Sequence, residues 1–322
     1  MQPPVLETEN LVKVYGKGET RFDALKGLTL EIHRGESVAV IGKSGSGKST
    51  LMHLMALLDR PSQGVVALDG SPVSELSTKE INRLRNERFG FVFQQFFLNA
   101  NQTVLENVVL PLKIAGVGKS ERNRKGMEAL ERLGMADKAS NKATNLSGGQ
   151  KQRACIARAL VTEPSVIFAD EPTGNLDSRT SEIVEDILFG LQREQGITLV
   201  IVTHDDDLAA RCDRRINLVD GEITSVQDHD DTTSTPASAQ PTAPGQAPTA
   251  EQPAAGEDVA GQGAAAAGPW AQIPDGDGAH RGEPQPQEDA AKAKAKAKAQ
   301  AEQSKHADKG GLRRLFSKGD RR

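Results

Sequence analysis

The segment GKSGSGKST, residues 42–50, constrains the fold of this chain more than any other feature. It follows the short apolar run SVAVIG and precedes apolar residues with helical spacing from Lys48 to Leu58, so we expect a strand, a tight turn and a helix. Glycines at this spacing let successive backbone N–H groups face one centre. The segment therefore predicts a phosphate-binding loop in an α/β domain, with a merely flexible glycine loop as the alternative.

Each residue of this phosphate loop receives an expected role. Lys48 is predicted to meet the β- and γ-phosphates of a nucleotide, and Ser49 is predicted to ligate Mg²⁺. The other positions are expected to contribute mainly through their backbone: Gly42, Lys43, Ser44, Gly45, Ser46, Gly47 and Thr50.

Acidic side chains follow a second apolar run, SVIFADEP at residues 165–172. The run predicts a buried strand whose carboxyl end presents Asp170 and Glu171, and ligands of parallel sheets collect at that end. Asp170 suits the magnesium shell, while Glu171 suits the activation of an attacking water. The alternative is that one carboxylate merely caps the next segment. His204 follows the run TLVIVT at the same edge, although a single histidine is more often structural or solvent-facing.

The order of elements predicts an α/β domain with a largely parallel sheet. The apolar runs FGFVFQ, SVIFAD and TLVIVTH are separated by helical patterns such as Ser181 to Glu194. Before the phosphate loop, LETENLVKVYG and LKGLTLEIHRGE alternate apolar and polar residues. This alternation predicts antiparallel strands beside the nucleotide site.

The pentapeptide LSGGQ, residues 146–150, precedes a long stretch with helical spacing. Ser147 and Gln150 fit a reciprocal capping box, which predicts a helix start. A helix N-terminus also offers unpaired N–H groups and a positive dipole end, so Ser147 with the amides of Gly148 and Gly149 would suit an anion. The pentapeptide alone leaves both interpretations open.

Composition divides the 322 residues into one folded domain, residues 1–226, and a tail. In the Ala/Pro/Gly-rich tail, 227–322, the large apolar residues are too few for a core, which predicts disorder. Eleven acidic residues and one basic residue lie between 228 and 289, whereas eleven basic and three acidic residues follow. Residues 311–318 fit a short basic amphipathic helix for an anionic membrane, although a solvated tail is the simpler interpretation.

Two further features bear on location. Cys155 and Cys212 show no paired spacing, which favours a reducing compartment. The first residues lack a signal-peptide pattern, and no apolar run reaches the roughly 18 to 20 residues that span a bilayer. We therefore expect a cytoplasmic protein that does not cross a membrane by itself, and we expect no nucleic-acid partner.

The order phosphate loop, FVFQ, LSGGQ, DEP and VTHD closely resembles the ATP-binding subunits of ABC transporters, over about residues 5–226. The resemblance implies a P-loop NTPase core of the RecA-like type, an antiparallel β subdomain and a helical subdomain at about 95–160. It also implies ATP hydrolysis, with ATP and Mg²⁺ as cofactors.

The resemblance assigns roles to residues that the motifs alone leave undecided. Tyr15 matches the aromatic residue that stacks on adenine, Gln94 matches the glutamine that touches magnesium and water, and His204 matches the histidine that contacts the γ-phosphate. The loop that crosses between subunits in the family is matched by GNLD, which contains Asn175, Leu176 and Asp177.

In that family the LSGGQ of one subunit closes over the ATP held by another. The chain is therefore expected to form a homodimer, or to pair with a second ATP-binding subunit, and to sit on the inner face of the cell membrane through an integral membrane permease. DEPTGNLDSRT resembles the branch of macrolide-export, lipoprotein-release and cell-division ATPases. Phe96 and Phe97 are expected to line the groove that receives a permease helix.

Two departures from the family pattern and three alternatives accompany this resemblance. NANQTV replaces a frequent leucine-proline pair near the expected permease contact, and the proline usually found just ahead of LSGGQ is missing. One alternative is an ATP-driven regulator that couples through a permease to cell-wall enzymes without transport. A DNA-repair or translation cassette protein usually carries two cassettes or a long insertion, and a GTPase or kinase does not account for LSGGQ.

Overall fold

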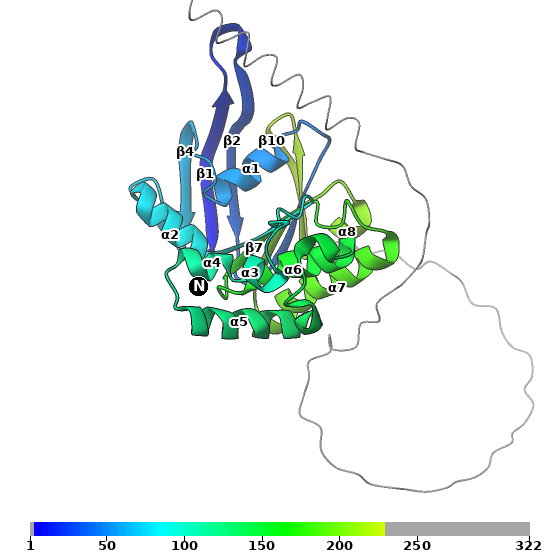
Figure 1. The fold of residues 1–322 in the computed structure, drawn as a ribbon. Helices are drawn as coiled ribbons and strands as arrows, with labels where there is room; N and C mark the ends of the chain where they lie inside the picture. The colour runs from blue at the N-terminus through cyan, green and yellow to red at the C-terminus, as the bar shows by residue number, and fades with distance from the viewer. Residues whose placement is uncertain (1–2, 229–322) are drawn as a thin grey trace, which may run out of the picture. The chain divides into compact units, whose positions relative to one another are not determined.

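The structure is a computed structural model that describes residues 3–228, whose strands form two sheets (Figure 1). The predicted disordered tail and the amphipathic pattern at 311–318 lie outside the described residues. The prediction of an α/β fold with a largely parallel sheet and an antiparallel β portion is confirmed by the sheet topology.

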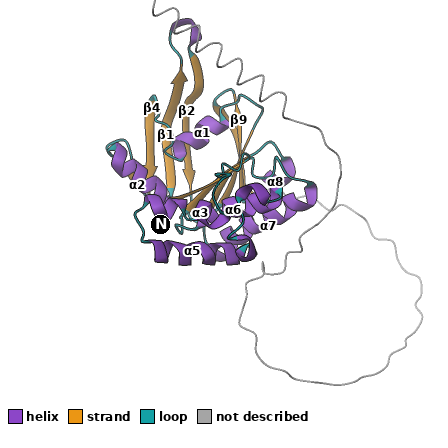
Figure 2. Cartoon of the chain, viewed as in Figure 1, coloured by secondary structure: helices purple, strands orange, loops and turns teal. Residues whose placement is uncertain are grey.

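The first sheet is antiparallel and has four strands in the order β2-β1-β4-β5. Its members are β1 (Leu6–Tyr15), β2 (Phe22–Ile32), β4 (Gln63–Leu68) and β5 (Ser71–Pro72). Figure 2 shows the long strands β1 and β2 side by side. Tyr15 and Phe22 are cross-strand partners where this hairpin turns, so two aromatic residues stand opposite each other.

The second sheet has six strands in the order β10-β9-β3-β8-β7-β6, all parallel to their neighbours except β10. Its strands are β3 (Ser37–Ile41), β6 (Phe89–Phe93), β7 (Val166–Asp170), β8 (Thr198–Val202), β9 (Arg214–Val219) and β10 (Glu222–Asp228). Because β3, β7 and β8 are parallel neighbours, the loops after their carboxyl ends meet at one edge.

Eight α-helices occur in the described part of the chain. They are α1 (Lys48–Met55), α2 (Thr78–Arg88), α3 (Val104–Val108), α4 (Leu110–Ile114), α5 (Lys119–Arg132), α6 (Gly148–Leu160), α7 (Ser178–Gln195) and α8 (Asp206–Ala210). Figure 1 shows α1 beside β1 and β2, and α3 to α7 grouped at the end of the view opposite the turn between β1 and β2. None of the helices within residues 3–228 has the length and apolar character needed to cross a bilayer.

Two apolar cores lie on opposite faces of the six-stranded sheet. Alternate residues of each strand face opposite sides. Val166 and Phe168 of β7 therefore join the core that contains α1 and the antiparallel sheet, whereas Ile167 and Ala169 join the core that contains α6 and α7. This double burial explains why the central strands appear in the sequence as uninterrupted apolar runs.

Candidate active site

The phosphate loop joins β3 directly to α1, and its conformation depends on glycine at two close contacts. Gly42 has φ +149° and Gly47 has φ +105°. A Cβ on Gly42 would lie 2.2 Å from the carbonyl oxygen of Leu218, and one on Gly47 would lie 2.7 Å from that of Ala24. The turn therefore requires glycine because neighbouring strands approach it closely and because its φ values are left-handed.

A cleft of about 700 Å³ opens above this loop. It brings together most of the residues that the sequence predicts for the site: Gly42, Lys43, Ser44, Gly45, Gly47, Lys48, Ser49, Thr50, Gln94, Asp170, Glu171 and His204. Ser46 is not among the lining residues. It is only 5% exposed, and its backbone holds the loop by donating to the Lys43 carbonyl (3.1 Å) and accepting from Gly221 (3.0 Å).

Lys48 is held inside the loop by backbone carbonyl groups. Its Nζ donates to the oxygens of Gly42 (2.7 Å) and Lys43 (3.0 Å). An ammonium group carries three donors, so one N–H remains for a ligand in addition to these two bonds. The loop thus presents a fixed positive charge next to its own N–H groups.

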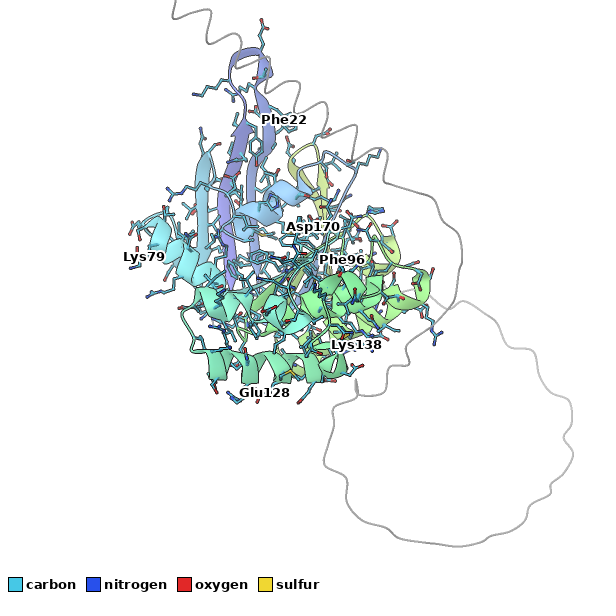
Figure 3. The ribbon with its side chains drawn as sticks, viewed as in Figure 1. Phe22, Lys79, Phe96, Glu128, Lys138 and Asp170 are labelled. Atoms are coloured by element: carbon cyan, nitrogen blue, oxygen red, sulfur yellow. The ribbon has the colours of Figure 1, made fainter. Side chains whose placement is uncertain are left out.

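Two adjacent carboxylates face the cleft at the end of β7, where Figure 3 labels Asp170. Burial raises the pKa of Asp170, and the neighbouring Glu171 carboxylate raises it further. Glu171 has a left-handed φ of +46°, which is costly for a residue other than glycine. A strained non-glycine residue in a polar cleft is a feature found at functional sites.

The Glu171 carboxylate is fixed by side chains from the loop after β8. His204 Nδ1 lies 2.7 Å from Glu171 Oε1, and Thr203 donates its hydroxyl to Glu171 Oε2 (3.3 Å). The hydrogen bond with Glu171, and then its charge, raise the pKa of His204. Because the His204 side chain is 74% exposed, it can reach a ligand in the cleft without a change in the core.

Gln94 follows β6 and connects the cleft to the loop after Glu171. Asn175 donates its side-chain amide to the Gln94 carbonyl (2.8 Å). A Cβ on Gly174 would lie 2.7 Å from Gln94 Nε2, so the loop passes directly over this side chain. Asp177 then caps α7 by accepting bonds from the backbone and hydroxyl of Thr180 (3.0 and 2.8 Å).

We call residues 146–150 the signature tip. Ser147 Oγ accepts from the Gln150 backbone (3.3 Å) and Gln150 Oε1 accepts from the Ser147 backbone (3.0 Å), which is the reciprocal capping box. Gly148 and Gly149 form the first turn of α6. No residue of the signature tip lines the cleft described above, and neither does Asp177. In one chain, therefore, the structure does not bring the signature tip and the phosphate loop together.

Tyr15 also lies outside the cleft lining, at its margin. Its hydroxyl donates to Asp59 Oδ2 (3.0 Å), and Lys13 Nζ lies 4.9 Å from the centre of its ring. Phe22, its cross-strand partner, lines the cleft and is 57% exposed. Figure 3 labels Phe22 on β2. Phe22 belongs to no sequence motif, because it reaches the cleft through the pairing of two strands, which no local pattern shows.

Comparison with known proteins decides the family. A family model described as ABC transporter matches residues 25–174. The lipoprotein-releasing system ATP-binding protein LolD of Geobacter metallireducens is 47% identical over 221 residues, which are 69% of this chain and 98% of that protein. The chain belongs to the ABC transporter ATP-binding family. The predicted family and the predicted ABC-type ATP hydrolase are thereby confirmed.

Two further relatives agree with this family. The macrolide export ATP-binding/permease protein MacB of Hyphomonas neptunium is 46% identical over 225 residues, which are 70% of this chain and 35% of that protein. The structure of the ATP-binding cassette MJ0796, a dimer in a post-hydrolysis state bound to ADP and Pi, is 40% identical with a TM-score of 0.64. The match covers 70% of this chain and 98% of the cassette chain. The named relatives match the branch predicted from the sequence.

Proposed function

We propose that two copies of this chain enclose two Mg·ATP molecules, each held by the cleft of one copy and the signature tip of the other. One observation carries the proposal: the cleft contains a phosphate loop, two carboxylates, Gln94 and His204, while the signature tip lies outside it. The tip is a capped helix start with free N–H groups, which is a suitable partner for phosphate oxygens. The related cassette structure is a dimer bound to ADP and Pi, which supports the pairing of two copies.

Within each cleft, the phosphate loop is proposed to hold the triphosphate through its backbone N–H groups and Lys48. Ser49, Asp170 and Gln94 offer hydroxyl, carboxylate and amide oxygens, the hard donors that Mg²⁺ prefers. Bound there, Mg²⁺ would neutralise charge on the β- and γ-phosphates. These residues lie around one cleft, so the donor set fits the ion.

Glu171 is proposed to orient and polarise the attacking water, because its carboxylate faces the cleft and is held by Thr203 and His204. His204 is proposed to contact the γ-phosphate with its exposed ring. Phe22 lines the cleft and Tyr15 is its cross-strand partner, and we propose that adenine stacks on these aromatic residues.

We propose that the partner is an integral membrane permease, which would hold the chain at the inner face of the membrane. A groove of about 540 Å³ is lined by apolar groups that include Phe91, Phe93, Phe97, Leu110 and Ile114. Phe97 lies there as expected, whereas Phe96 is not among the residues that line the groove. Phe97 is 65% exposed and Ile114 is 69% exposed, which is unusual for large apolar side chains. Such a groove suits the apolar face of a helix. The names of the LolD and MacB relatives favour an export or extraction system.

Co-purification tests this partner directly. The full chain, tagged and extracted from its own membranes in mild detergent, is expected to bring one permease with it. Phe97→Glu places a charge in the groove and should abolish the association, whereas Glu182→Gln, an exposed substitution on α7, should not. Nucleotide binding by the same samples reports that each variant is folded. Recovery of the permease with Phe97→Glu at the level of the unchanged protein would reject this groove as the contact.

A further inference from the structure

Gln152 is a fully buried polar residue that joins α6 to the loop after Glu171. Its exposure is 0%, and its Nε2 donates to the carbonyl oxygen of Pro172 at 2.6 Å. A carbonyl can only accept, so this contact fixes which end of the amide faces Pro172. The bond connects elements that are 20 residues apart in the sequence.

The two ends of this amide differ in their surroundings. Gln152 Oε1 is buried and has no hydrogen-bond partner among residues 3–228. A buried polar atom without a partner destabilises the folded state, and an apolar side chain of similar shape would avoid that cost. The bond to Pro172 is therefore the one hydrogen bond that the Gln152 side chain makes within the described residues, and it is the contact through which this residue can act.

That bond holds the residue directly after the strained Glu171. Two hydrogen bonds hold Glu171 from the side of β8. Its backbone N–H donates to the Val202 carbonyl (2.9 Å), and its carboxylate accepts from Thr203 in the loop after β8. Its φ of +46° persists only where the surroundings impose it. Gln152 supplies the restraint from the α6 side.

The same helix begins at the signature tip. Gln152 lies four residues after Gly148, about 6 Å along the helix axis, so a shift of the tip moves both together. Gly149 is also packed on the first turn of α7, since a Cβ there would lie 2.4 Å from Thr180 Cγ2. Helix α6 and the hydrogen bond from Gln152 to the Pro172 carbonyl thus link the signature tip to the residue after Glu171.

We propose that Gln152 is a positioning residue that couples the signature tip, engaged with one nucleotide, to the alignment of Glu171 at the other. This inference rests on the proposed function, in which the tip contacts the nucleotide of the partner copy. Gln152 is fully buried and does not line the cleft. It acts through the Pro172 carbonyl and the backbone of Glu171.

Gln152→Met removes the donor and keeps the length of the side chain. We expect the kcat for ATP hydrolysis to fall by about 10- to 100-fold, because a small misplacement of a reacting group has effects of that size. The KM for ATP and the Mg·ATP-dependent dimerisation should stay within about twofold, since neither the cleft nor the tip loses a contact. A kcat within twofold of the unchanged protein would overturn the inference.

Gln152→Glu provides a second readout that packing alone would not move. A carboxyl group buried here has a raised pKa, and its protonated form can donate to the Pro172 carbonyl whereas its ionised form cannot. The ratio of the kcat of this variant to that of the unchanged protein should therefore rise as the pH falls. For Gln152→Met the same ratio should not change with pH, and parallel profiles for the two variants would overturn the inference.

Dimerisation in the Glu171→Gln background separates this inference from the proposed function. If Glu171→Gln alone stays monomeric with Mg·ATP, the proposed function fails and the coupling fails with it. If Glu171→Gln forms a dimer but the Gln152→Met, Glu171→Gln double variant does not, Gln152 is needed for the tip itself and only the coupling is rejected. The coupling requires that both proteins form the dimer.

Discussion

The phosphate cleft and the signature tip differ in how much of a ligand site one chain completes. The cleft gathers the Lys48 ammonium group, two carboxylates and the glycine turn around one space. Two backbone carbonyl groups already hold Lys48 there. The signature tip has a capped helix start and tight packing on α7, but it contributes no residue to the cleft lining. The first region is suited to bind a nucleotide alone, whereas under the proposed function the second acts on a ligand brought by another copy.

This difference predicts that substitutions in the two regions fail in different assays. A change in the phosphate loop of the cleft should be visible in a single chain, through nucleotide affinity. A change in the signature tip should leave that affinity intact and appear only when two chains meet.

Glu171→Gln is expected to have the largest effect. Loss of a general base lowers turnover by about 10²- to 10⁴-fold, while the amide keeps the shape of the side chain and ATP binding. Phosphate release measures the turnover, and size-exclusion chromatography with light scattering should show a trapped dimer with Mg·ATP. Glu182→Gln, exposed on α7, is the matched control and should behave like the unchanged protein. Normal hydrolysis by Glu171→Gln would remove Glu171 from its proposed role.

Lys48→Ala should weaken ATP binding by roughly 10- to 100-fold, because hydrogen bonds to a charged group contribute about 1.5–3 kcal/mol. Titration calorimetry on the isolated chain measures this loss without a partner. Lys119→Ala, at the exposed start of α5, removes the same charge far from the phosphate loop and should not change the affinity. Equal affinities for all three proteins would contradict the assignment of the cleft.

Ser147→Arg should give the complementary result. It fills the signature tip with a long side chain, so turnover and Mg·ATP-dependent dimerisation should fall by more than about tenfold while the isolated chain binds ATP as before. Loss of the cap costs about 1 kcal/mol, or roughly 2–4 °C in Tm. Ser120→Arg on α5 is the control. Loss of ATP affinity in the isolated chain would show that the tip belongs to its own cleft.

The smallest expected effect is a change in the titration of His204. Its pKa is raised chiefly by the hydrogen bond with Glu171, so Glu171→Gln should lower this pKa toward the ordinary value of histidine. Because the folded pKa is the higher one, the contact stabilises the fold at low pH, and this contribution is lost as the pH rises through the folded pKa. NMR titration of the ring protons measures the shift. An unchanged pKa would show that Glu171 does not set it.

Local signals made the fold and much of the cleft predictable. The phosphate loop, the capping box of Ser147 and the strand end at Asp170 each depend on residues adjacent in the chain, and the structure has these elements where the sequence places them. The central strands were predictable because burial on both faces gives uninterrupted apolar runs.

The features of the site that the sequence does not predict depend on contacts between segments that are distant in the chain. Phe22 reaches the cleft through the pairing of β1 with β2, and Gln152 meets Pro172 because α6 packs on the six-stranded sheet at β6. The left-handed φ of Glu171 depends on restraints from several elements at once. Such features arise from tertiary packing, which spacing along one chain does not encode.

The arrangement of two copies around Mg·ATP can be seen in a crystal structure of Glu171→Gln with Mg·ATP. We expect a dimer in which Ser147 and the Gly149 amide of one copy lie within hydrogen-bond distance of the triphosphate that Lys48 of the other copy holds. A triphosphate contacted by only one chain, or a dimer formed through another face, would contradict it.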